Sequence, residues 1–246
     1  TEDLDLSYRA ALRGWRGHYI HELSVPNELP RHMRALKVQQ RRWSRGTAQS
    51  MRKLYGAIVE GRDRLTDWFE EAFLLAGYLI HPILLANLLL WPVAVLHVNR
   101  PFFLGLQALM SLATVAAPLT LVVTVHERDG RLPGPRAIGQ VLAGMCIGLG
   151  LMVNNTVAQV QGLIAGEGEF VRTPKGGGAL VERYRLPLHW TFFAELAVVA
   201  YCLWGVALLV QAGEALWAAP LVFWGGCVAL VVYLQLAALS QPTAQS

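Results

Sequence analysis

Long stretches without a charged residue dominate the chain after residue 71. Four runs contain no Asp, Glu, Lys or Arg: 72–98, 101–125, 137–166 and 215–246. A fifth run, 186–213, contains only Glu195. A helix needs about 20 apolar residues to cross a bilayer. The pattern therefore predicts a mainly α-helical integral membrane protein.

The first 71 residues are amphipathic and highly charged. They hold 13 of the 21 Lys+Arg and 10 of the 17 Asp+Glu residues. Leu4, Tyr8 and Leu12 recur at helical spacing before Gly14, which predicts a short helix. Residues 15–20 alternate like a short strand. Residues 31–71 predict amphipathic helices in the headgroup plane, interrupted near Gly46.

The distribution of arginine predicts the topology. The Arg-rich N-terminal region and the Arg-bearing links around 126–136 and 167–187 belong in the cytoplasm by the positive-inside rule. A run between two cytoplasmic links should not cross, so 137–165 is predicted to be an interfacial or re-entrant helix. Four spans are expected, at about 72–97, 102–125, 189–211 and 215–238.

Charge and cysteine content narrow the functional class. The net charge of +4 gives no case for nucleic acid, and contact with anionic lipid headgroups accounts for most of the arginines. Cys146, Cys202 and Cys227 lie in apolar runs without metal-ligand spacing. We interpret them as small buried residues.

Three polar stretches are candidates for chemistry. "TED" at 1–3 offers a general base, although a carboxylate there could simply cap a helix. Gln39, Arg42 and Trp43 share one helix face, where Arg can grip a phosphate and Trp can stack on a sugar, or anchor the helix at the headgroups. "EFVRTPKGGG" at 169–178 reads as a gating loop or as a flexible linker.

The order of these stretches resembles the processive family-2 membrane glycosyltransferases. TED, Q-x-x-R-W, interface helices, two spans and an F-x-x-T-x-K loop follow one another. The likeness is strongest to bacterial relatives of cellulose and mannan synthases. It implies that residues 1–30 are the tail of a GT-A α/β catalytic domain, that 31–71 are interface helices, and that 72–240 form the membrane region with a gating loop at 167–187.

The resemblance also implies roles for individual residues. Asp3, within Thr1–Asp3, would be the catalytic base. Gln39 and Arg42 would hold the diphosphate or the acceptor, while Trp43 would stack on the terminal sugar. Phe170, Thr173 and Lys175 match the gating loop, in which Arg172 replaces the family's Val.

By the same resemblance, the intact enzyme would transfer a hexose with inversion from a nucleotide sugar, of the UDP-glucose or GDP-mannose type, to a growing β-linked polysaccharide. It would use Mg²⁺ or Mn²⁺ and translocate its product across the bacterial inner membrane, with its catalytic side in the cytoplasm. Because no donor-binding or metal-binding Asp pair is visible in residues 1–246, the chain alone is expected to be an inactive C-terminal part.

Two other readings stay open. A non-processive relative would glycosylate a lipid and share the same motifs. A non-enzymatic membrane subunit or transporter would depend on intramembrane polar residues instead of Asp3. Glu195, Asn154 and Asn155 are the residues that such a protein would use.

Overall fold

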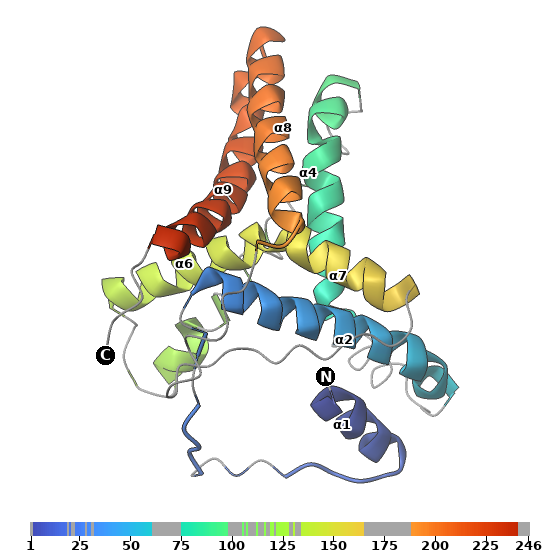
Figure 1. Cartoon of the computed structure of the whole chain (residues 1–246). Coiled ribbons are helices and arrows are strands. Elements are labelled where there is room, and N and C mark those ends of the chain that lie inside the picture. Colours follow the sequence, from blue (N-terminus) through green and yellow to red (C-terminus); the bar gives the residue numbers. More distant parts are fainter. Residues whose placement is uncertain are drawn as a thin grey trace. The chain divides into compact units, whose positions relative to one another are not determined.

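The computed structural model of the chain describes residues 2–18, 20, 23–27, 29–30, 32–60, 75–97, 105, 107, 112, 116, 119–120, 122–127, 130, 134–164 and 188–240. Every regular element in these residues is helical (Figure 1), which confirms the predicted fold class; the elements are α1 (Glu2–Leu12), α2 (Met33–Glu60), η1 (Gly77–Leu79), α4 (Ile80–His97), α6 (Pro135–Gly150), α7 (Met152–Ile164), α8 (Thr191–Gln211), η3 (Ala215–Ala218) and α9 (Ala219–Ser240).

The prediction of a strand at 15–20 is wrong at the positions that the structure describes. Residues 15–18 and 20 have no regular structure. An alternating pattern becomes a strand only when a partner supplies its hydrogen bonds. No strand occurs among the described residues, so the alternation at 15–20 has no such partner there.

The chain forms two compact units, whose boundary runs through α4, α8 and α9. Unit 1 comprises Thr1–Leu85, Met152–Ala194 and Val232–Ser246, and unit 2 comprises Ala86–Leu151 and Glu195–Val231. The polar helices α1, α2 and α7 therefore belong to unit 1.

In unit 1, α2 is one helix of 28 residues, about 42 Å long at 1.5 Å per residue. The expected interruption near Gly46 is wrong. The helical turn around that glycine is buried, including Ser44, Thr47 and Ala48, so tertiary contact offsets its poor propensity. The helix α1 packs on the C-terminal half of α2 through a small core of Tyr8, Leu54, Ile58 and Leu75.

The helices α2 and α7 approach one another closely at Gly162. A Cβ atom on this glycine would lie 2.5 Å from the Arg45 carbonyl oxygen and 2.7 Å from the Ala48 Cβ. Ala48 is fully buried. Small residues thus set the separation of the two helices, as is common where helices pack in membrane proteins.

The chain bends by 50° between α6 and α7. Pro135 starts α6 and Leu151 ends it, with the Leu151 N–H donating to the Ile147 carbonyl. A break of this kind suits either a bent span or a re-entrant helix pair. The predicted re-entrant segment at 137–165 coincides with this pair, and its course in the bilayer stays a prediction.

Unit 2 is built from apolar helices that match the predicted spans. Three helical segments are long and apolar enough to cross a membrane: Gly77–His97, Thr191–Gln211 and Ala215–Ala238. They coincide with the predicted spans 72–97, 189–211 and 215–238, and most of the predicted span 102–125 lies outside the described residues.

Aromatic and small residues pack the helices of unit 2 together. Trp91 is buried, lies edge-on to Trp224 and donates its indole N–H to the Trp217 carbonyl at 2.7 Å. Gly225 lies against Cys202, where a Cβ would be 2.8 Å from the cysteine Cβ. Cys202 and Cys227 are free and buried, as expected, whereas Cys146 is half-buried.

Gly162→Ala should destabilise the protein by about 1–3 kcal/mol, because the added methyl group overpacks the contact between α2 and α7. Gly144→Ala is the matched control, since a Cβ at this α6 glycine meets nothing within 4 Å. Thermal unfolding in detergent measures both variants. Equal melting temperatures would contradict the close approach at Gly162.

Cysteines introduced singly at Gly130 and Gly177, in a background with the three native cysteines replaced by serine, should be labelled from the same side of the membrane. Residues 130 and 177 flank the α6–α7 pair, and Gly177 lies outside the described residues. Impermeant thiol reagents applied to sealed vesicles of both orientations test this. Labelling from opposite sides would make the pair a bent span.

Candidate functional site

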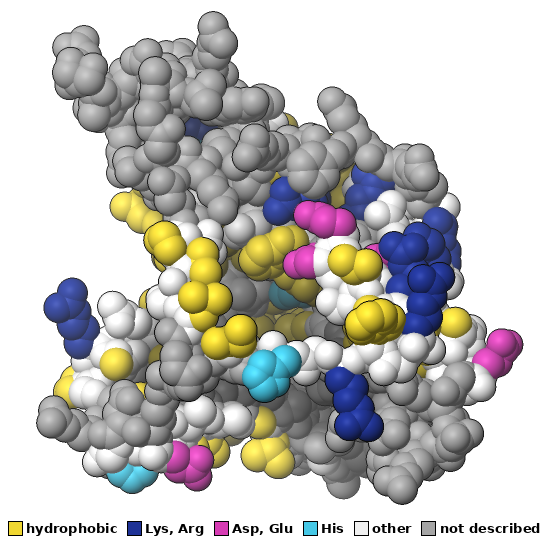
Figure 2. Space-filling view, turned by 90° about the horizontal axis from the view of Figure 1, so that it is seen from below, with side chains coloured by type: hydrophobic (Ala, Val, Ile, Leu, Met, Phe, Trp, Pro, Cys, Tyr) yellow, Lys and Arg dark blue, Asp and Glu magenta, His cyan; other side chains and the backbone are white. Residues whose placement is uncertain are grey.

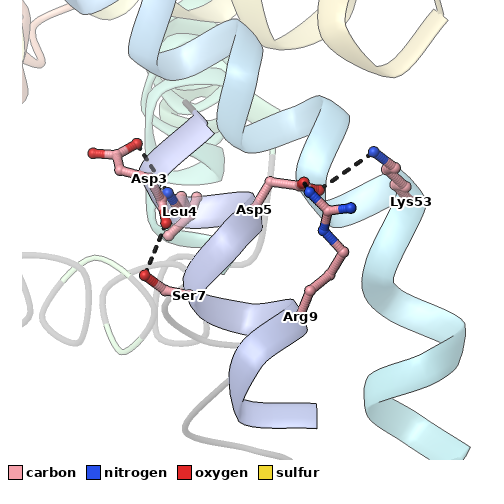
Figure 3. Close-up of polar contacts among 6 residues, drawn as sticks. All are labelled: Asp3, Leu4, Asp5, Ser7, Arg9 and Lys53. Atoms are coloured by element: carbon pink, nitrogen blue, oxygen red, sulfur yellow. Dashed lines mark hydrogen bonds and ion pairs between the residues drawn. The ribbon is translucent and has the colours of Figure 1, made fainter. Parts of the chain in front are cut away.

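The carboxylate of Asp3 is exposed in the first turn of α1. It accepts the Leu4 N–H at 2.9 Å, and the Asp3 carbonyl accepts the Ser7 hydroxyl at 2.8 Å. Figure 3 shows the Asp3 carboxylate turned away from Asp5, which pairs with Arg9 at 2.5 Å and with Lys53 at 3.5 Å. Asp5 therefore helps to hold α1 on α2, whereas Asp3 has only a local contact and stays open to solvent.

The first turn of α1 is suited to negative charge. Glu2, Asp3 and Asp5 lie in the first turn, at the positive end of the helix dipole. The face that carries α1 shows acidic side chains beside a group of Lys and Arg side chains (Figure 2). Thr1, the first residue of the predicted motif, lies outside the described residues.

Gln39, Arg42 and Trp43 lie on one continuous helix, as predicted, and Trp43 has 38% of its surface exposed. At 100° per residue they face away from Lys37, Arg41, Ser44 and Ala48, a stripe that meets α7. The motif side chains therefore point away from α7.

The structure brings α1 and the motif helix into one unit without placing Asp3 against the motif. The ion pair of α1 reaches Lys53, ten residues after Trp43 and about 15 Å farther along the helix axis. Asp5, which makes this pair, thus lies against the part of α2 that follows the motif.

Sequence analysis missed a network of polar side chains between α2 and α7, called here the α2–α7 polar cluster and made of Lys37, Arg41, Ser44, Asn154, Asn155, His189 and Thr191. Arg41 is its centre. One Arg41 nitrogen donates to Asn154 Oδ1 at 3.0 Å and to Thr191 Oγ1 at 3.1 Å, and the other lies 2.7 Å from His189 Nε2.

Further hydrogen bonds extend the cluster along both helices. Asn154 donates to the Lys37 carbonyl at 3.2 Å and to the Asn155 side chain at 3.0 Å. Ser44 donates to the Asn155 carbonyl at 2.9 Å. Lys37, only 5% exposed, donates to Gln235 of α9 at 2.9 Å. The cluster thus ties α2 to α7, to the start of α8 and to the end of α9, all within unit 1.

The sequence contained a signal for this cluster. Lys37, Arg41 and Ser44 form a polar stripe on one helix, and Asn154 and Asn155 lie together in a charge-free run. Asn154 and Asn155 had been singled out only as candidates for a transporter. In the structure their contacts join α7 to α2. Glu195, the third such candidate, is fully buried in α8.

His189 must be neutral to accept from Arg41. A guanidinium only donates, so Nε2 accepts and the ring proton is assigned to Nδ1, which then donates to Thr191 Oγ1 at 3.2 Å. With this assignment the Thr191 N–H, 3.3 Å from the same Nδ1, makes no hydrogen bond to it. Although the residue keeps much of its surface exposed, partial burial of the ring, followed by the charges of Arg41 and Lys37, lowers the pKa of His189 to about 4. The imidazole is therefore neutral at neutral pH.

The predicted gating residues Phe170, Thr173 and Lys175 lie outside the described residues. Their roles stay predictions. Among the residues that the structure does describe, no three His, Cys, Asp or Glu side chains are grouped as metal ligands.

The family model of glycosyl transferase family group 2 matches residues 1–126 of the chain. The chain belongs to this family. The matched region contains Asp3, Gln39, Arg42 and Trp43, whereas the predicted gating loop lies beyond it. The predicted resemblance to cellulose synthase-like family-2 glycosyltransferases is thereby confirmed, and the bacterial origin stays a prediction.

Two curated relatives come from Arabidopsis thaliana. Probable glucomannan 4-β-mannosyltransferase 1 of Arabidopsis thaliana is 28% identical over 182 residues, 73% of this chain and 32% of that protein. Glucomannan 4-β-mannosyltransferase 7 of A. thaliana is 46% identical over 63 residues, 26% of this chain and 11% of that protein. The chain thus spans about a third or less of their length, and no solved structure matches it.

Acidification from about pH 6.5 to about pH 4 should destabilise the protein partly through His189. Unfolded histidine takes up a proton near pH 6.5, but folded His189 does so only near pH 4, so the unfolded state binds more protons in this window. The free energy of unfolding should therefore fall as the pH falls.

His189→Gln keeps an acceptor for Arg41 but does not titrate, so its melting temperature should depend less steeply on pH between 6.5 and 4. Burial, followed by the charge of Arg34, also lowers the pKa of His32. Because the wild type and the variant both contain His32, its contribution to the pH dependence is the same in each. Thermal unfolding in detergent at stepped pH makes the comparison. Parallel curves for the two proteins would show that His189 does not carry the effect.

Proposed function

We propose that this chain forms the acceptor-side and membrane part of an inverting hexosyltransferase that extends a β-linked polysaccharide and passes it into the membrane. The observation that carries the proposal is that unit 1 holds the solvent-open Asp3 of α1 beside α2, which displays Gln39, Arg42 and Trp43 within the family-matched region. The relatives are named glucomannan 4-β-mannosyltransferases, which favours a mannosyl donor of the GDP-mannose type and a β-1,4-glycan acceptor.

Asp3 is proposed as the general base. Its carboxylate would take the proton from the acceptor hydroxyl while the hydroxyl oxygen attacks the anomeric carbon, and the bond to the nucleoside diphosphate would break on the opposite side. Attack from the opposite side inverts the configuration. The exposure of Asp3 and its single local hydrogen bond leave the carboxylate accessible for this step.

Gln39, Arg42 and Trp43 are proposed to bind the reacting groups. Arg can bind a phosphate through two parallel hydrogen bonds. The exposed surface of Trp43 offers an apolar face on which the terminal sugar can stack.

The family resemblance puts most ligands of the divalent metal in the N-terminal half of the intact enzyme, and the described residues of this chain group no three candidate ligands. The proposed roles therefore involve only the side chains of this chain. The helices of unit 2 and the Arg-rich N-terminal region support a catalytic side in the cytoplasm and a product path through the bilayer.

In an active enzyme that contains this chain, Asp3→Asn should lower turnover about 10²–10⁴-fold while donor affinity is preserved, because the variant keeps the shape but cannot accept the proton. Glu2→Gln is the matched control: it removes the same charge from the same exposed turn of α1. Rates and donor affinities with GDP-mannose and UDP-glucose test this. Equal, small losses in both variants would leave Asp3 as a helix-stabilising charge only.

Trp43→Ala should weaken acceptor binding and shorten the polysaccharide product, because the stacking face is lost. Tyr55→Ala is the control, since Tyr55 is an exposed aromatic residue on the same helix. Product length on gels and membrane retention are measured for both. If Trp43→Ala leaves both chain length and turnover at the level of Tyr55→Ala, Trp43 is an interface anchor. A wild-type product of single-sugar size on lipid would favour a non-processive enzyme.

A further inference from the structure

We propose that Gln40 and Arg41, the two unspecified positions of Q-x-x-R-W, are positioning residues that fix the rotation of α2 about its axis and thereby aim Gln39, Arg42 and Trp43 at the substrate. This inference rests on the proposed function. It assigns the two x positions a role distinct from ligand binding.

Arg41 is committed to protein acceptors. Its two terminal nitrogens contact Asn154 and Thr191 at 3.0 and 3.1 Å and His189 at 2.7 Å. These acceptors come from α7 and from the turn that starts α8. A guanidinium engaged with three acceptors on two other segments is poorly placed to release them for a phosphate. Arg42, on the far side of the helix, is the arginine that faces away from α7.

The contacts of Arg41 also depend on the shape of its head group. The planar fork of guanidinium nitrogens reaches three acceptors at once, which the single ammonium of lysine cannot reproduce in the same geometry. Buried Asn154 and Thr191 would then lose a donor. A buried acceptor left without its partner destabilises the fold, so the helix would shift to find a replacement.

Gln40 supplies a second tether on a different side of α2. Its side-chain oxygen accepts the Tyr78 hydroxyl of η1 at 3.0 Å. Consecutive helical residues point about 100° apart. Tethers at Gln40 and Arg41 therefore hold α2 from two directions, and a rotation that relaxes one strains the other.

Two further contacts restrain the other motions of α2 relative to α7. Ser44, one turn after Gln40, is bonded to the Asn155 carbonyl, which opposes sliding of α2 along α7. The close approach at Gly162 sets the separation of the two helices. Rotation about the axis is then the motion that Gln40 and Arg41 restrain.

The geometry of a helix makes that restraint matter for Trp43. Side-chain atoms lie about 6 Å from the helix axis, so a rotation of about 20° moves them by about 2 Å. A misplacement of about 1 Å can lower the rate of an enzyme about 10²-fold. If α2 can rotate slightly about its axis, turnover should thus fall even though no ligand-binding side chain has been removed.

Arg41→Lys should lower kcat about 10–100-fold in an active enzyme that contains this chain, with less than about a 3-fold change in KM for GDP-mannose. The matched control is Arg52→Lys. Arg52 also links α2 to α7, through the Leu163 carbonyl at 3.1 Å, but lies about 16 Å along the helix from Arg41. Its variant should keep turnover within about 2-fold.

Tyr78→Phe is the second variant, since it removes only the hydroxyl that holds Gln40 and is a milder change than Arg41→Lys. It should lower kcat about 3–10-fold with the donor KM unchanged, a smaller loss than for Arg41→Lys because one of several tethers is removed. If Arg41→Lys does not fold, Tyr78→Phe alone decides. Turnover in Arg41→Lys equal to that in Arg52→Lys, or wild-type turnover in Tyr78→Phe, would overturn the inference.

The Asp3→Asn variant separates this inference from the proposed function. If Asp3→Asn abolishes turnover while both positioning variants behave like wild type, the proposed function stands and the inference fails. If Asp3→Asn retains turnover, the proposed function fails first. A changed donor KM in Arg41→Lys, without loss of kcat, would make Arg41 a ligand-binding residue and would also overturn the inference.

Discussion

The hydrogen bonding of two cationic side chains between helices, one of them buried and the other half-buried, is the constraint on which unit 1 depends. Lys37 is almost completely buried, and Arg41 is held among buried Asn154 and Thr191. A buried charge is tolerated only when hydrogen-bond partners replace the water that it loses. These partners come from α7, α8 and α9, so satisfying the two cations fixes where those segments meet α2.

Apolar packing alone could not specify this arrangement. The spans α4, α8 and α9 are apolar around their whole circumference, and such helices can turn in the bilayer with little change in burial. Specific contacts must then define their rotation. In unit 2 the Trp91 indole and glycines such as Gly225 do so, through one hydrogen bond and through close approach. In unit 1 a polar network does so, and its directional hydrogen bonds define orientation more sharply.

The same network explains how an amphipathic helix can present a functional face. One side of α2 carries Lys37, Arg41 and Ser44 toward α7, and the opposite side is left to Gln39, Arg42 and Trp43. The helix α1 is added farther along through a small apolar core and the Asp5–Lys53 pair. Because Asp5 takes the structural ion pair, Asp3 keeps an exposed carboxylate in the same helical turn.

The sequence by itself determined the helical class, three of the membrane spans and the grouping of Gln39, Arg42 and Trp43 on one helix face. These follow from local rules: bilayer thickness sets span length, and 100° per residue sets which positions share a face. Only the tertiary structure decided that α2 continues through Gly46, that residues 15–18 and 20 form no strand, and which way the motif faces. These features depend on contacts between residues more than 100 positions apart, such as Arg41 with Asn154 and Thr191. A local pattern can show that Arg41 is a cation on a helix, but only the fold supplies the acceptors that bind its guanidinium group.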